Sequence, residues 1–180
     1  IVGVVRATRS APAVTLGVSP RGAAMVLHAA KSWAWLAGRP YVTPDEVMAM
    51  ASTACEPLAS RSGVDIAVES EEGLPQLQVD RGRIAQVFQN LLENAVQHSL
   101  RGQAVVIRAE KADGEREGVR FSVEDTGPGF LPGDPHRVFE PFFTRRRGGT
   151  GLGLSIVQRI VEQHGGEVAA ANRPSGGAVM

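Results

Sequence analysis

Several features that classify other proteins are scarce or absent in this 180-residue sequence. Its single cysteine, Cys55, excludes an internal disulfide and fits a reducing compartment. The formal net charge is 0, so no global field attracts nucleic acid or an anionic membrane, and any anion site must be local. No run of about 18 apolar residues and no charged-then-apolar leader occurs, so we expect a cytoplasmic segment without membrane contact. The chain opens at Ile1 without a methionine, and we expect a fragment whose full-length protein could be anchored in a membrane elsewhere.

What remains is a globular composition, with 43% hydrophobic and 21% charged residues. Two helix-start signals lie near the N-terminus. Ser19-Pro20 predicts a helix over 20–37, because serine caps a helix and proline fits its first position. Thr43-Pro44-Asp45-Glu46 is a capping box that predicts a second helix from Pro44, and Pro57 should end or kink that helix.

Trp33 and Trp35 lie roughly 200° apart around the first helix, so this helix needs neighbours on several sides. We interpret them as core residues of a small helical bundle. The alternative is a partner surface, and a homodimer through the N-terminal helices is left open.

Four short segments in this region also occur together in a known family. They are Val5-Arg-Ala-Thr-Arg9, Leu16-Gly-Val-Ser-Pro-Arg21, Ala29-Ala-Lys31 and Gly38-Arg-Pro-Tyr-Val-Thr-Pro-Asp-Glu-Val47. With them, residues 1–51 resemble the C-terminal helical lid of MoxR-type AAA+ ATPases. The chain has no GxxxxGK[ST] phosphate loop, so the lid would be present without its ATPase core, and we expect a structural role for Arg21.

From about residue 52 the pattern changes to mixed strands and helices. A helix is expected from the N-cap Asp80 to about His98, and another over 151–163. The expected strands are 64–69, a short one at 77–79, a hairpin of 103–110 with 118–125, and a last one at 166–171.

Asn90 and Asn94 lie at i and i+4 of the first of these helices, so both project from one side, with Gln97 and His98 on a nearby turn. An amide oxygen is a neutral, hard ligand that suits Mg²⁺ bound to a nucleotide. The alternative is a solvated polar face.

Asp125 ends a strand in which residues 119, 121, 123 and 125 share the buried face. A buried carboxylate is costly unless a donor meets it, and the exocyclic amine of adenine is such a donor. Gly127 and Gly129 would let the backbone approach a flat ring. The alternative is an aspartate that starts a Gly-Pro turn.

A glycine-rich stretch, 148–153, leads directly into the helix at 151–163. Free N–H groups at a helix start form a ready anion site. No strand immediately precedes the stretch, which argues against a Rossmann motif. Arg137 and Arg145–Arg147 add positive charge, and Phe139, Phe142 and Phe143 are interpreted as anchors of a closing lid. The alternatives are a solvated loop and a weak nucleic-acid patch.

In this order, the motifs resemble those of the ATP-binding catalytic domain of sensor histidine kinases. This is the superfamily of gyrase, MutL and the ninety-kilodalton heat-shock chaperones. The N box is Asn90-Leu-Leu-Glu-Asn-Ala95, the first glycine box Asp125-Thr-Gly-Pro-Gly129, the F box Phe139-Glu-Pro-Phe-Phe143, and the second glycine box Gly149-Thr-Gly-Leu-Gly-Leu154. For residues 52–180 the resemblance implies the Bergerat fold, a two-layer α/β sandwich with a mixed, mostly antiparallel sheet, here with an N-terminal helical appendage.

The resemblance also implies Mg-ATP as ligand, with Asn94 as the metal ligand and Asn90 supporting it. Asp125 would read adenine, Arg145 and the amides of 149–153 would hold phosphates, and residues 130–148 would form a lid. Gln97 replaces a lysine found in many members, which puts one phosphate contact in doubt. The expected ATP-binding residues are Asn90, Asn94, Gln97, His98, Asp125, Gly127, Gly129, Phe142, Thr144, Arg145, Gly149, Thr150, Gly151, Leu152 and Gly153.

The family transfers the γ-phosphoryl group to a histidine on a separate helical hairpin. None of His28, His98, His136 and His164 starts such a motif, so the resemblance implies a kinase domain with no catalytic acceptor residue in this chain. Its implied partners are a histidine phosphoacceptor (dimerisation) domain and a response regulator. Two rivals stay open: a nucleotide sensor without phosphotransfer, and a helical interaction module. The sequence leaves open whether the joint near 50–57 is natural, engineered or a gene-assembly error.

Overall fold

The computed structural model describes residues 42–112, 118–146 and 148–180. The predictions for the helix at 20–37, for its two tryptophans and for Arg21 lie outside these residues.

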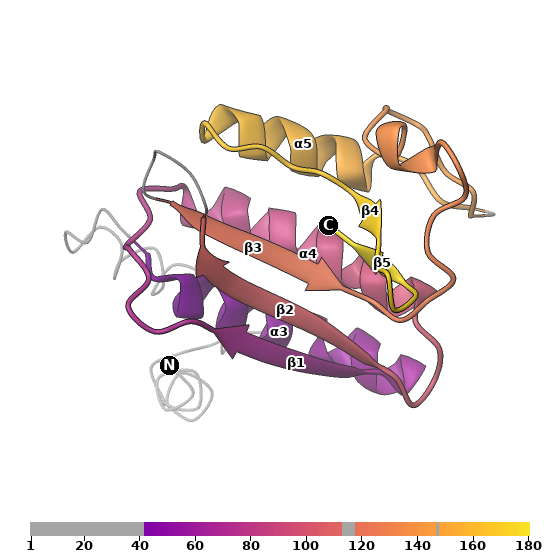
Figure 1. Ribbon diagram of the computed structural model, residues 1–180, viewed down its shortest axis with the longest axis horizontal. Helices are drawn as coiled ribbons and strands as arrows, with labels where there is room; N and C mark the ends of the chain where they lie inside the picture. Colours follow the sequence, from indigo (N-terminus) through magenta and orange to yellow (C-terminus); the bar gives the residue numbers. More distant parts are fainter. Residues whose placement is uncertain (1–41, 113–117, 147) are drawn as a thin grey trace, which may run out of the picture. The chain divides into compact units, whose positions relative to one another are not determined.

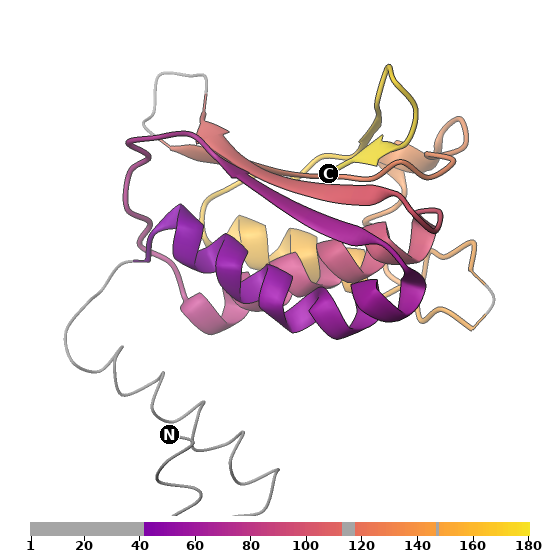
Figure 2. The same cartoon turned by 90° about the horizontal axis from the view of Figure 1, so that it is seen from below.

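Three helices lie on one side of a five-stranded sheet and form the second layer of the domain (Figures 1 and 2). The helices are α3 (Pro44–Ser62), α4 (Arg81–His98) and α5 (Gly153–Gln163). The strands are β1 (Asp65–Ser70), β2 (Ala104–Lys111), β3 (Val119–Glu124), β4 (Ala171–Asn172) and β5 (Ala178–Val179), with a short 3₁₀ turn η1 (Asp134–His136) in the loop before α5. No helix in the described part of the chain is long and apolar enough to cross a membrane.

Helix α3 begins as predicted but does not end at Pro57. The side chain of Thr43 accepts from the N–H of Glu46, and the side chain of Glu46 accepts from the N–H of Thr43, which completes the capping box. Pro57 lies on the exposed side of the helix, so water can reach the carbonyl that its missing N–H leaves unpaired. The opposite side is continuously buried, and this packing carries the helix past the proline to a left-handed Gly63 cap.

Helix α4 forms because its N-cap and its apolar stripe agree. Asp80 accepts from the N–H of Arg83 at 3.0 Å and satisfies one of the free donors of the first turn. The buried side chains recur at helical spacing: Ile84, Val87, Phe88, Leu91, Leu92, Ala95 and Val96. The helix therefore packs one face against the sheet, and its polar stripe lies outside the core.

The sheet order is β1-β2-β3-β5-β4, and only the β1–β2 pair is parallel. Helix α4 makes the crossover between these two parallel strands. The predicted hairpin is confirmed, with Val106 opposite Glu124 and Lys111 opposite Val119. The mixed, mostly antiparallel two-layer sandwich expected from the sequence is thus the observed fold.

Two strand predictions were wrong. The segment at 77–79 forms only an isolated bridge, Leu77 with Val42. The strand expected at 166–171 is absent except for its last residue, because residues 178–180 bond the edge of β3 instead. The N–H of Val123 donates to Met180 at 2.8 Å, and that of Asp125 donates to Ala178 at 3.0 Å.

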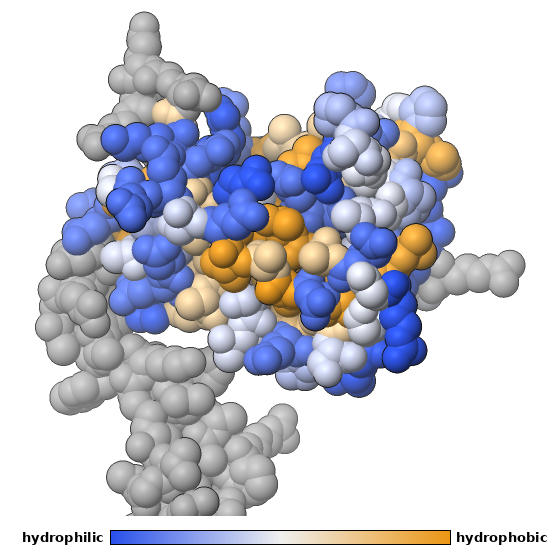
Figure 3. Space-filling model, turned by 60° about the horizontal axis from the view of Figure 1, so that its bottom comes forward, coloured by the Kyte–Doolittle hydropathy of each residue, from blue (hydrophilic) through white to orange (hydrophobic). Residues whose placement is uncertain are grey.

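The core lies between the helices and the inner face of the sheet. Inward strand residues Val105, Ile107, Ala109 and Val123 are 0–1% exposed. The outer face instead carries a chain of ion pairs that links Glu69, Arg108, Glu124 and Arg173. In the view of Figure 3, hydrophilic residues surround an apolar area.

The predicted domain boundary after residue 51 falls inside α3, and α3 belongs to a compact unit that spans Tyr41–Met180. The boundary itself stays a prediction.

Candidate functional site

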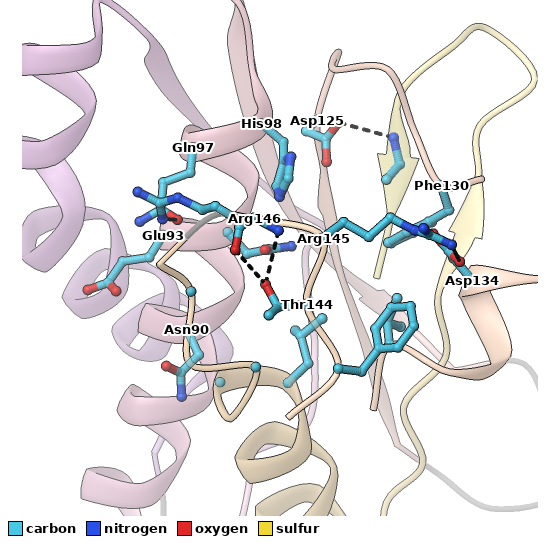
Figure 4. A pocket seen from close by; sticks show the side chains of 18 of the residues that line it. Asn90, Glu93, Gln97, His98, Asp125, Phe130, Asp134, Thr144, Arg145 and Arg146 are labelled. Atoms are coloured by element: carbon cyan, nitrogen blue, oxygen red, sulfur yellow. Dashed lines mark hydrogen bonds and ion pairs between the residues drawn. The ribbon is translucent and has the colours of Figure 1, made fainter. Parts of the chain in front are cut away.

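One pocket of about 490 Å³ lies between the C-terminal half of α4, the end of β3, the loop that follows β3 and the start of α5 (Figure 4). It brings together most of the residues expected from the sequence. The lining includes Asn90, Asn94, Gln97, His98, Asp125, Gly129, Thr144, Arg145, Gly149, Thr150, Gly151 and Gly153.

The α4 wall of the pocket is the polar stripe of that helix. Asn90, Asn94 and Gln97 follow one another at spacings of four and three residues, so they form one row. The Nδ2 of Asn90 is buried and has no hydrogen-bond partner among the described residues. A Cβ placed on Gly153 would lie 3.6 Å from the Oδ1 of Asn90, so the start of α5 closely faces this row.

Asp125 lies at one end of the pocket and is 3% exposed. Its Oδ1 accepts from the backbone N–H groups of Gly127 at 2.9 Å and Ala178 at 3.1 Å. Arg173 donates to its backbone carbonyl at 2.9 Å. These bonds fix the carboxylate, and Figure 4 shows its other oxygen pointing into the pocket.

Two glycines let other backbone pack against this aspartate. A Cβ on Gly127 would lie 2.4 Å from the carbonyl oxygen of His98, and one on Gly177 would lie 2.0 Å from that of Asp125. Gly127 therefore does not line the pocket but joins the end of α4 to the turn after β3. Position 127 therefore requires glycine because the backbone of His98 packs against it, and not because an adenine ring would approach it.

In the loop, Arg145 and Asp134 form a two-bond ion pair. The Nε of Arg145 lies 2.6 Å from Oδ2 of Asp134, and a terminal nitrogen lies 2.8 Å from Oδ1. These hydrogen bonds hold the pKa of Asp134 below its usual value and raise that of Arg145. The Asp134 side chain is only 7% exposed, whereas that of Arg145 is 58% exposed.

The next residue, Arg146, extends in the opposite direction. Its guanidinium donates to Oε1 of Gln97 on α4 (Figure 4). Its backbone is held by a turn: its N–H donates to Oγ1 of Thr144 at 3.1 Å, and its carbonyl accepts from Gly149 at 3.1 Å.

The adjacent Phe142 and Phe143 differ in their positions. The ring of Phe143 lines the pocket, with the Arg137 guanidinium 4.7 Å and that of Arg145 5.9 Å from its centroid. Phe142 is 73% exposed, has φ 67° and does not line the pocket. Leu152, the third expected residue outside the lining, is the N-cap position of α5, whose first turn receives no side-chain cap.

Further lining residues were not among the expected ATP-binding residues: Glu93, Pro128, Phe130, Leu131, Asp134, Val138, Phe143, Arg146, Leu154 and Ala178. Two of them had been singled out in the sequence for the loop, Phe143 as an anchor and Arg146 as positive charge. Glu93 could have been found, because it lies three residues after Asn90 on the same side of α4. Asp134 and Ala178 could not, since their place depends on the path of the loop and of the C-terminal strands.

Comparison with known proteins agrees with this geometry. The family described as "Histidine kinase-, DNA gyrase B-, and HSP90-like ATPase" matches residues 79–180, and the "AAA lid domain" matches residues 6–75. The sensor protein KinB for alginate biosynthesis, from Pseudomonas aeruginosa, is 41% identical over 117 residues, which are 64% of this chain. The chain spans only 16% to 26% of the length of the first curated relatives that it matches.

Solved structures resemble the fold as well. The catalytic domain of histidine kinase ThkA is 31% identical, with a TM-score of 0.68 over 77% of this chain and 90% of that one. Full-length ShkA in complex with AMPPNP is 29% identical, with a TM-score of 0.68 over 98% of this chain and 41% of that one. With its four motifs around one pocket, the chain belongs to the histidine kinase-, DNA gyrase B- and HSP90-like ATPase family, in the form of the ATP-binding domain of sensor histidine kinases.

Proposed function

We propose that this domain binds Mg-ATP and presents its γ-phosphoryl group to a histidine on another domain or chain. The observation that carries the proposal is the buried Asp125, held by two backbone N–H groups, in the same pocket as the Asn90–Asn94 row and the glycine-rich start of α5. The AMPPNP bound to the related ShkA supports a nucleotide as the ligand.

In the proposed complex, the adenine amine donates to the free oxygen of Asp125. The base lies at this end of the pocket, and the phosphates extend toward α4 and α5. Helix α5 begins with no side-chain cap, so its first N–H groups are available to an anion. Two amides of the loop before it already donate, that of Gly149 to the Arg146 carbonyl and that of Leu152 to Oγ1 of Thr150, and would have to exchange these bonds for a phosphate.

The chemistry of the α4 row fits a magnesium ion. Asn94 would supply an amide oxygen, with Asn90 beside it, and the nucleotide would supply further oxygens. The unpartnered Nδ2 of Asn90 is a buried donor that a bound nucleotide or its water could satisfy. The ion would neutralise charge on the phosphates, while the protein positions them for in-line transfer.

The partners in this proposal are a histidine-bearing dimerisation hairpin and a response regulator. The proposal also includes a cytoplasmic location, which the single cysteine supports.

The test is phosphotransfer in trans. The 180-residue chain is mixed with γ-labelled ATP, magnesium and the histidine hairpin of a related kinase such as KinB. We expect acid-labile, alkali-stable label on the hairpin and none when the hairpin histidine is replaced by glutamine. ATP binding without label on the native hairpin would instead favour a nucleotide sensor.

The interaction-module rival makes a different prediction. It requires that removal of residues 1–42 abolishes association with a partner while the affinity for ATP is unchanged. The kinase proposal requires loss of label whenever the pocket is disabled, for example by Asp125→Asn.

A further inference from the structure

Two adjacent arginines of the loop, Arg145 and Arg146, end on opposite walls of the pocket. Arg145 reaches Asp134, next to Phe130, whereas Arg146 reaches Gln97 on α4 (Figure 4). Gln97 continues the row of Asn90 and Asn94, which is where the metal and phosphates are proposed to lie. The two residues are therefore unequal candidates for a phosphate contact.

The charge of Arg145 is already neutralised. Both oxygens of Asp134 accept from it, and the Asp134 side chain is 7% exposed. If Arg145 moved to a phosphate, the little-exposed carboxylate of Asp134 would lose both of its side-chain hydrogen bonds and keep only the more distant charge of Arg137, which would cost free energy. The pair also connects two parts of the loop that are separated by 11 residues. Arg145 is thus better suited to hold the loop together than to bind a ligand.

The partner of Arg146 has the opposite character. Gln97 is neutral, so it orients the guanidinium without cancelling its charge. Both side chains are exposed, and the hydrogen bond between them can be exchanged for a charge-assisted bond at little cost. The turn through Thr144 and Gly149 fixes the backbone of Arg146 at this wall.

We propose that Arg146, positioned by Gln97, is the loop cation that binds the nucleotide's phosphates, and that Arg145 is reserved for Asp134. The pair of Gln97 and Arg146 then places one positive charge beside the Asn90–Asn94 row. This inference rests on the proposed function, and it replaces the sequence-based assignment of the phosphate contact to Arg145.

The test compares Mg-ATP with adenosine, which shares the base but has no phosphate. Arg146→Gln should weaken Mg-ATP binding by about 10- to 100-fold, the usual effect of losing a hydrogen bond between charged groups. Adenosine binding, measured by displacement of a fluorescent adenine nucleotide, should change less than twofold. Arg159→Gln is the matched control, because it removes the same charge from an exposed position of α5 that does not line the pocket.

Rescue and neutralisation variants sharpen the test. Gln97→Lys in the Arg146→Gln background should restore most of the lost affinity, because the cation then projects from α4 itself. Gln97→Glu alone should weaken Mg-ATP binding, because it neutralises Arg146 as Asp134 neutralises Arg145. The double variant Asp134→Asn/Arg145→Gln, which keeps a hydrogen-bonding pair, should retain the ratio of Mg-ATP to adenosine affinity.

The inference is overturned if Arg146→Gln leaves Mg-ATP affinity unchanged, if it weakens adenosine equally, or if the Asp134/Arg145 double variant loses the preference for Mg-ATP. Failure of the proposed function looks different, since the unmodified chain would then bind no Mg-ATP at all.

Discussion

The Asp125→Asn substitution replaces a single oxygen atom of the pocket with an amide nitrogen. Oδ1 of Asp125 accepts from the N–H groups of Gly127 and Ala178, and an asparagine can keep both bonds through its own carbonyl oxygen. The amide nitrogen must then replace the oxygen that points into the pocket. The substitution should therefore leave the fold almost unchanged, with the free energy of unfolding altered by less than about 1 kcal/mol.

The nucleotide should respond much more strongly. A donor would face the donor amine of adenine, and the mispaired buried groups should cost about 1–3 kcal/mol, or roughly 5- to 150-fold in affinity. Calorimetric titration of Mg-ATP measures this loss. Because an amide nitrogen can donate to the O6 of guanine, the ratio of Mg-GTP to Mg-ATP affinity should rise in the variant.

Asp80→Asn provides the matched control, since it makes the same chemical change at an N-cap position where asparagine is equally good. An Asp125→Asn protein that is folded and binds Mg-ATP with unchanged affinity and unchanged base preference would remove Asp125 from the adenine site.

Three further predictions concern the domain around the site. Pro57→Ala should raise the free energy of unfolding by about 1–3 kcal/mol in chemical denaturation, because it restores a helical hydrogen bond in α3; a less stable variant would contradict this. Burial, with a smaller effect from the charge of Glu93, raises the pKa of the Cys55 thiol to about 11, so a thiol reagent at pH 8 should label it only after unfolding. Rapid labelling of the native protein would refute that burial. Hydrogen bonds from Arg145 lower the pKa of Asp134, so the stabilisation by this pair is present above about pH 4 and is lost as the pH falls through the lower folded-state value. Asp134→Asn should flatten the pH dependence of stability in this acid range, and an unchanged dependence would show that the pair contributes nothing there.

The sequence predicted the parts of the fold that local rules decide. Helix α4 follows from an N-cap aspartate and an apolar stripe, and the β2–β3 hairpin follows from two runs joined by a glycine-containing turn. The burial of Asp125 followed from simple alternation along β3. In each case, one continuous stretch of the chain contains the whole signal.

The errors arose where distant segments compete. The segment at 166–171 has strand character, but residues 178–180 bond the edge of β3. Pro57 breaks helices in isolation, yet the buried side of α3 outweighs one missing hydrogen bond. The contacts of Asp134 with Arg145 and of Gln97 with Arg146 depend on the path of a loop, which composition does not reveal.

The most direct test of the account is calorimetric titration of Mg-ATP into the intact 180-residue chain. We predict saturable binding of one nucleotide per chain, weakened when magnesium is removed with EDTA, because Asn94 would supply an oxygen ligand to an ion that neutralises the phosphates. A folded protein that gives no calorimetric binding signal, and that binds no fluorescent adenine nucleotide that ATP can displace, would contradict the claim that this pocket binds ATP.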